Sequence, residues 1–241
     1  MALHAIFKET PVKFSSDYTF RVRTGQVANG RPMSLKNIRF TTGDNEVADS
    51  VATLYGGKRQ EWETKSEEIY EVLSEVPSIS IILETISSEY VLWGRANAPI
   101  RTCNGQTQAD DKQSPCACAT MVDDLAGWKA AAKQGTACAP TVKLTFALAE
   151  NPDIGLGRFQ SSSWGLAMGD PDWKKDKLTD GEIWQPPISD LETQLAEYGG
   201  RAMATLAIVP VDYETKAGRN VSYSKPVLTL TGPAPEEEGA F

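Results

Sequence analysis

Hydrophobic and polar residues alternate along several stretches of the chain, and this alternation predicts a fold built mainly of strands. The clearest case is 141–149, where every second residue is large and apolar. Residues 156–162 follow after an Asn-Pro-Asp turn and are predicted to pair with it as a hairpin. Near the C-terminus, 203–213 and 221–230 predict a second hairpin around a glycine-containing turn.

Weaker patterns predict the remaining elements. Four more strands are expected earlier in the chain: 14–23, 35–41, 78–85 and 89–95. Apolar residues at helical spacing, or alanine-rich composition, predict three helices: 44–55, 66–73 and 121–133. Another helix is expected from Ser189, which forms a capping box with Glu192 three residues later. Because neighbouring strands outnumber helices, the prediction is an α+β fold, mainly an antiparallel sheet with a few short helices.

These elements are expected to form a single α+β domain over residues 1–232. Two segments interrupt it. An insert at about 96–140 holds all the cysteines, and a charged excursion at about 169–187 contains two tryptophans. The last residues, 233–241, are rich in proline and glutamate and predict a disordered acidic tail.

Composition and charge narrow the class of protein. Hydrophobic residues make up 41% of the chain and charged residues 23%, as in ordinary folded proteins. The net charge of -8 opposes nonspecific attraction to phosphate backbones, which favours a protein that works through protein contacts. The chain has neither signal-peptide features nor an apolar run of about 18 residues, so a cytoplasmic protein without a membrane span is expected.

The four cysteines are the candidate chemistry. Cys103, Cys116, Cys118 and Cys138 lie close together, and the rest of the chain has none. In a reducing cytoplasm such a group more often binds a metal than forms disulfides. Four thiolates would give zinc a closed tetrahedral shell, which is typical of a structural site. The spacing is not that of two C-x2-C pairs, so unrelated buried cysteines or two disulfides stay open as alternatives.

Other chemistry has weaker support. The only histidine, His4, lies at the amino terminus and is not expected to act as a ligand or a catalytic base. No phosphate-binding loop or nucleophile elbow is present, so an enzyme is not expected. Trp173 and Trp184, in the charged excursion, are candidate anchors for a protein partner. A small zinc-dependent hydrolase and a single-stranded nucleic-acid binder remain the alternative functions.

Several stretches carry a resemblance to a known family: NGRPMSLKNIRFTTGDNEVADSVATLYGG, VLWGR, CNGQTQ, PCAC, GTACAPTVKLTFALAENPDIGLGRFQSSSW and ATLAIVPVDYETKAGRNVSYSKPVLTLTG. In these stretches the chain resembles the recombination directionality factors of actinobacterial temperate phages. The resemblance extends over about residues 21–232. Its most specific parts are the cysteine pattern and the strand pair that follows Cys138.

The resemblance implies a non-enzymatic protein that binds a large serine integrase in the cytoplasm of a bacterial host. The integrase alone joins phage and bacterial attachment sites. With such a factor bound, it recombines the two hybrid sites and excises the prophage. The resemblance also implies contact with the integrase's C-terminal zinc-containing region and coiled coil, and with DNA only indirectly. The acidic charge of the chain agrees with this mode of action.

Overall fold

A computed structural model describes residues 18–28, 30–64, 66–94, 98–170, 185–215 and 218–235. The strands are β1 (Phe20–Ala28), β2 (Arg31–Thr42), β3 (Arg59–Glu61), β4 (Tyr70–Leu73), β5 (Ser78–Trp93), β6 (Pro99–Cys103), β7 (Ala139–Leu148), β8 (Leu156–Ser161), β9 (Ala202–Glu214) and β10 (Asn220–Pro233). The helices are α1 (Asn45–Tyr55), α2 (Leu125–Lys133), α3 (Trp164–Met168) and α4 (Ile188–Glu197), with 3-10 turns η1 (Ala117–Met121) and η2 (Pro152–Ile154).

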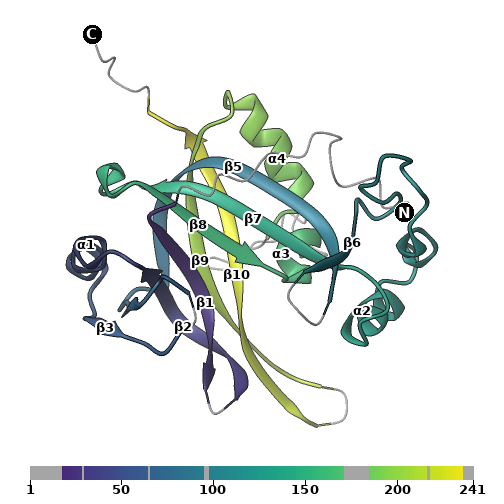
Figure 1. The fold of residues 1–241 in the computed structure, drawn as a ribbon, viewed down its shortest axis with the longest axis horizontal. Coiled ribbons are helices and arrows are strands. Elements are labelled where there is room, and N and C mark those ends of the chain that lie inside the picture. The colour runs from purple at the N-terminus through teal and green to yellow at the C-terminus, as the bar shows by residue number, and fades with distance from the viewer. Residues whose placement is uncertain are drawn as a thin grey trace.

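The ten strands form one sheet with the order β10-β9-β5-β7-β8-β1-β2-β4-β3, and β6 pairs with β5 beside this path. All the strand pairs are antiparallel except β1 with β8, which run parallel. The sheet curves strongly (Figure 1), so that β2 comes within 8 Å of β9 and β10, measured between Cα atoms. The predicted α+β fold with a mainly antiparallel sheet is confirmed.

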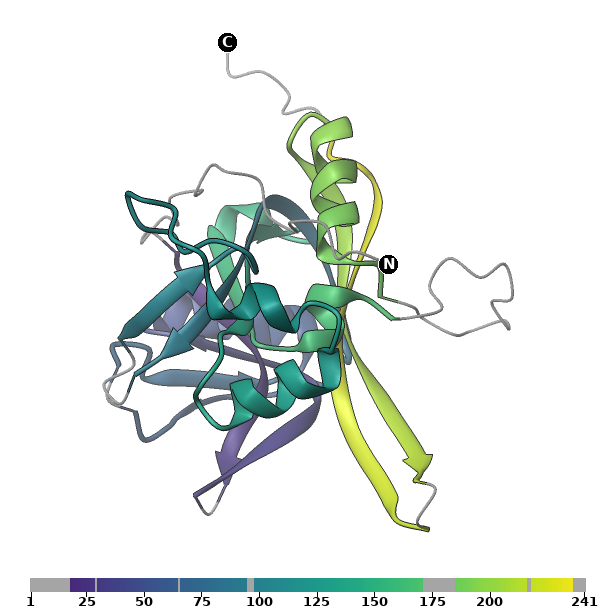
Figure 2. The ribbon, with the colours of Figure 1, turned by 90° about the vertical axis from the view of Figure 1, so that its right-hand side faces the viewer.

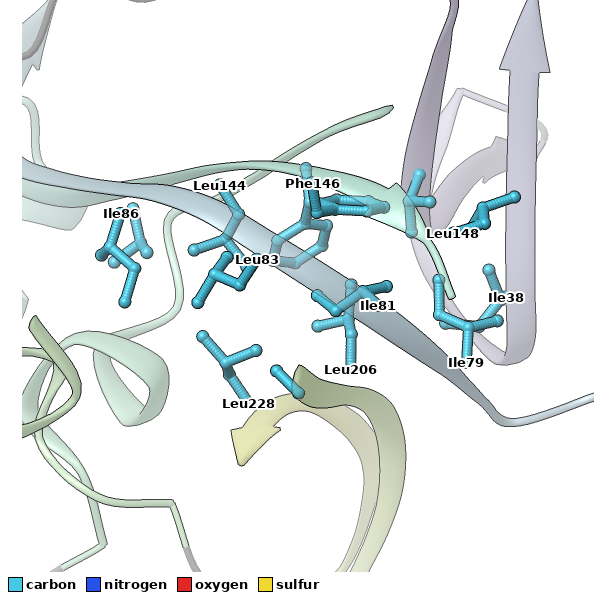
Figure 3. Packing of buried hydrophobic residues seen from close by; sticks show 14 of the residues in the cluster. Ile38, Ile79, Ile81, Leu83, Ile86, Leu144, Phe146, Leu148, Leu206 and Leu228 are labelled. Carbon is cyan, nitrogen blue, oxygen red and sulfur yellow. The ribbon is translucent and has the colours of Figure 1, made fainter. Parts of the chain in front are cut away.

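The core fills the inside of this curved sheet. Leu144, Phe146 and Leu148 of β7 are fully buried there beside Ile81 and Leu83 of β5 (Figure 3). They are alternate residues of their strands, so the period of two that predicted the 141–149 strand marks its core-facing side. Burying each of these side chains stabilises the fold by about 1.5–3 kcal/mol.

The strands predicted over 78–85 and 89–95 are a single strand, β5, so the break predicted between them is wrong. Ser87 and Ser88 stay in register with Lys143 and Val142 of β7, because β7 offers hydrogen-bonding partners along almost the whole strand. The opposite edge of β5 pairs with β9 in its first half and with β6 in its last residues. This division places the cysteine segment at one end of the sheet.

The helix predicted over 66–73 is also wrong, because this segment contains the strand β4. Val72 is buried whereas Leu73 is 40% exposed, so the helical spacing of apolar residues does not match the buried side. Pairing with β2 on one edge and β3 on the other outweighs the helical pattern. The predicted 14–23 strand is seen from Phe20 onward, and residues before Tyr18 lie outside the described part.

The observed start of helix α1 agrees with the prediction, and that of helix α4 does not. Asp44 caps α1 as predicted, since its carboxylate accepts the backbone N–H groups of Glu46 and Val47. The capping box predicted at Ser189 is wrong, because α4 already begins at Ile188 with Pro187 as its N-cap. None of the helices in the described part of the chain has the length and apolar character needed to cross a bilayer.

The predicted C-terminal hairpin is confirmed as β9 and β10, which pair along almost their full length. Its turn end extends away from the rest of the sheet (Figure 2). Helices α3 and α4 pack against β10. Of the predicted tail, Pro233 is the last residue of β10, and residues 236–241 lie outside the described part.

Gly157 of β8 marks a point where the core leaves no room for a side chain. An added Cβ would overlap the Phe20 ring and lie 2.9 Å from Cε2 of Phe146. We therefore expect Gly157→Ala to lower the free energy of unfolding by about 3 kcal/mol, as overpacking does. Gly165→Ala in α3 is the control, because its Cβ would have only Ser163 Oγ nearby, at 3.6 Å. Urea unfolding measures both, and equal midpoints would contradict the prediction.

Candidate metal centre

The structure brings all four cysteines together at the end of the sheet. Cys103 ends β6, Cys116 caps η1, Cys118 lies within η1, and Cys138 directly precedes β7. Their sulfur atoms all lie within 4.8 Å of one another. All four side chains are buried, and none forms a disulfide.

This arrangement fits a tetrahedral thiolate site. A zinc–sulfur bond of about 2.3 Å sets a sulfur–sulfur separation of about 3.8 Å in a regular tetrahedron. The observed limit of 4.8 Å is close to that value, so small side-chain movements suffice to enclose an ion. Four sulfur donors without oxygen or nitrogen suit a thiophilic metal.

Side-chain and backbone hydrogen bonds hold the loop between Cys103 and Cys116. Asn104 Oδ1 accepts the backbone N–H groups of Gln106 at 2.9 Å and Thr107 at 2.8 Å. The Cys116 N–H then donates to the Gln106 carbonyl at 2.7 Å, which fixes Cys116 opposite Cys103. Local polar contacts therefore hold the loop in the conformation that presents its two cysteines.

Gly105 allows this loop to approach the aromatic wall of the site. Its φ of +94° is in the left-handed region, and an added Cβ would lie 3.3 Å from the Tyr90 ring and 3.7 Å from the Trp128 ring. A side chain at this position would therefore strain the backbone and crowd both rings.

An aromatic cluster covers the inner side of the cysteines. The Trp128 ring centroid lies 4.7 Å from that of Tyr90 and 5.4 Å from that of Trp164, the latter in an edge-on arrangement. Trp128 Nε1 donates to the Cys138 carbonyl at 2.9 Å. Through these contacts β5, α2 and α3 share one buried cluster with the four cysteines, separate from the main core.

The thiols of Cys103, Cys118 and Cys138 influence one another's pKa values. The pKa of the Cys138 thiol is lowered to about 2, chiefly because Cys103 and Cys118 donate S–H groups to it and also because Arg101 lies beside it. The pKa of Cys103 is raised in turn, because its hydrogen bonds to Cys118 and Cys138 favour the protonated thiol. The hydrogen bonds within the cluster therefore favour ionisation at Cys138.

The structure tests none of the other candidate residues that the sequence singled out. His4, Trp173 and Trp184 lie outside the described residues. Of the nearby acidic residues, Asp110 accepts the Ser114 backbone N–H and Asp124 caps α2.

Sequence reasoning missed Arg101, whose Nε lies 3.4 Å from Cys138 Sγ. It lies two residues before Cys103 on β6, so strand alternation puts both side chains on one face. The two-residue spacing of Arg101 and Cys103 is visible in the sequence, but the sequence pattern did not predict that β6 is a strand.

A polar cluster of charged residues lies on β1, β2, β4 and the segment just before β4. It contains three ion pairs: Arg21–Glu68, Arg23–Glu68 and Arg39–Glu71. Burial opposes the ionisation of Glu68, but hydrogen bonds from Thr41 and Arg23 and the charge of Arg21 outweigh it, so its pKa is lowered. These arginines are therefore largely neutralised within the protein.

A comparison with known families decides the class of this protein. The model of a family described as Gp3-like, recombination directionality factor-like, matches residues 20–169. This range is more than half of the chain and contains all four cysteines. The chain belongs to this Gp3-like family.

Membership in the Gp3-like family assigns the general role of a recombination directionality factor, a regulator of phage recombination that is generally non-catalytic and acts with a recombinase. The match includes β1 to β8 and the four-cysteine cluster, and it ends before α4 and the β9–β10 hairpin. No solved structure matches the chain.

Proposed function

We propose that this protein binds a large serine integrase and switches it from integration to prophage excision, by protein contact and without catalysis of its own. The observation that carries the proposal is the Gp3-like match over residues 20–169. The site of action is the cytoplasm of the bacterial host, where integrase and prophage meet.

The charge of the protein supports contact with the integrase over direct contact with DNA. A net charge of -8 repels the phosphate backbone at long range. The arginines of β1 and β2 are paired with Glu68 and Glu71 and offer little free positive charge to phosphates. DNA is then engaged only through the integrase.

The partner surface is the integrase's C-terminal zinc-containing region together with its coiled coil. A binder can redirect recombination only by the difference between its affinities for two integrase arrangements. A complete switch, from 1:99 to 99:1, requires a difference of about 10⁴-fold. Trp173 and Trp184 remain the predicted anchor residues of this contact.

The four cysteines are proposed to hold a structural zinc ion. Their burial, their mutual distances and their all-sulfur chemistry support it. An ion bound by the four thiolates would link β6, η1 and the start of β7, and its positive charge would offset part of the negative charge of the sulfur atoms. A shell completed by Cys103, Cys116, Cys118 and Cys138 leaves no position for a water molecule, which argues against the alternative of a zinc-dependent hydrolase.

Recombination with purified cognate integrase tests the function. Adding the protein is expected to suppress joining of phage and bacterial attachment sites and to promote recombination between the two hybrid sites. Because the effect follows from binding, it should saturate with the concentration of added protein and need no further cofactor. The proportion of each product, measured on gels, gives the result.

Unchanged attachment-site preference at saturating protein would contradict the proposal. A shift of short single-stranded oligonucleotides by the protein alone, persisting at moderate salt, would favour the nucleic-acid-binding alternative instead.

The double variant Trp173→Ala with Trp184→Ala tests the predicted anchor residues of the integrase contact. It is expected to weaken integrase binding.

A further inference from the structure

Arg101 places a guanidinium group against the four-cysteine cluster. Its Nε donates to Cys138 Sγ at 3.4 Å. Arg101 and Cys103 lie two residues apart on β6, and therefore on the same face of the strand. The strand that ends in one candidate ligand thus also carries the cation that contacts another.

A second nitrogen of this guanidinium group, Nη2, is buried without a hydrogen-bond acceptor among the described residues. A buried donor without an acceptor is unfavourable, because its lost hydration is not replaced. Negative charge close to the group reduces this cost, and four thiolates around a divalent ion would carry two excess negative charges.

We propose that Arg101 is a positioning residue of the metal centre, which neutralises part of the cluster's charge and holds the Cys138 sulfur in place. The inference rests on the proposed metal site. Residues just outside the ligands often fix ligand orientation and tune affinity in this way. On the metal, Cys138 is already a thiolate, so the N–H bond from Arg101 makes it a weaker nucleophile, since the intrinsic nucleophilicity of a thiolate falls as its basicity falls.

Competition between the protein and a chelator for zinc measures the affinity. Arg101→Gln is expected to weaken binding by about 10–100-fold, the range seen when such supporting contacts are removed. Arg101→Lys keeps the charge but loses the Nε contact, so a smaller loss is expected. Arg59→Gln is the control, because Arg59 pairs with Asp49 at 2.8 Å on another part of the sheet.

Two further measurements separate positioning from a general effect on folding. Absorption bands of the cobalt-substituted protein report the number of sulfur ligands, and Arg101→Gln should keep those of the wild type. Iodoacetamide labelling of the zinc-loaded protein, located by mass spectrometry, should be faster at Cys138 in both Arg101 variants. Local unfolding would instead raise labelling at all four cysteines.

The outcomes distinguish the two proposals. A wild-type protein that binds neither zinc nor cobalt overturns the metal site and the role of Arg101 together. A wild type that binds metal, with unchanged affinity in Arg101→Gln, overturns only the role of Arg101. If Arg101→Gln does not fold, Arg101→Lys decides, because unchanged labelling of its Cys138 contradicts the proposal.

Discussion

Cys138→Ser is expected to abolish stoichiometric zinc binding and to lower the free energy of unfolding by about 4 kcal/mol or more, as loss of a structural metal does. Cys138 is fully buried, carries the lowered pKa and has contacts with Cys103, Cys118 and Arg101. A neutral serine hydroxyl cannot replace its thiolate. Zinc per chain after gel filtration and chemical unfolding with and without a chelator are the measurements.

Leu144→Ala is the matched control for Cys138→Ser. Leu144 is also fully buried, but it belongs to the main core inside the sheet. Its truncation should cost about 2–5 kcal/mol and leave zinc content at one ion per chain. Full zinc content in Cys138→Ser would contradict the four-cysteine site, as would equal unfolding curves for the wild type with and without chelator.

The parts of the fold that sequence predicted well are those whose alternation coincides with burial. In the 141–149 strand the large alternating residues all belong to the main core, although Thr141, Thr145 and Ala147 between them are buried as well. The errors arose where hydrogen bonding to neighbouring strands, and not the local sequence pattern, determines the secondary structure. Ser87 and Ser88 look like a turn, yet β7 draws them into the sheet. Val72 lies in an apparent helix pattern, but two neighbouring strands supply its backbone partners.

The grouping of the four cysteines was predictable from the sequence, and the surroundings of the candidate site were not. Cysteine is rare and chemically distinctive, so Cys103, Cys116, Cys118 and Cys138 could be grouped from spacing alone. Their neighbours come from three different elements: Tyr90 from β5, Trp128 from α2 between Cys118 and Cys138, and Trp164 from α3. No local pattern relates these residues, because their proximity depends on how β5, α2 and α3 pack.

Trp128 is the residue through which that packing should affect the metal centre most strongly. Among the described residues it is the largest fully buried side chain, and it contacts the rings of Tyr90 and Trp164 and donates to the Cys138 carbonyl. Trp128→Ala should therefore lower the free energy of unfolding by about 3–5 kcal/mol and also weaken zinc binding. Trp128→Phe keeps most of the apolar volume but leaves the carbonyl unpaired, so about 1–3 kcal/mol is expected.

Comparison with and without chelator shows whether Trp128 and the metal stabilise the same unit. Because they share a buried cluster, Trp128→Ala should cost less in the metal-free protein than in the zinc-loaded one. Trp62→Ala is the control, since Trp62 lies against the Arg39 guanidinium on another part of the sheet. That variant should have the same cost in both states and full zinc content. An equal cost of Trp128→Ala in the two states would mean that the aromatic wall folds independently of the metal, and its hydrogen bond to Cys138 would then be a contact without energetic coupling.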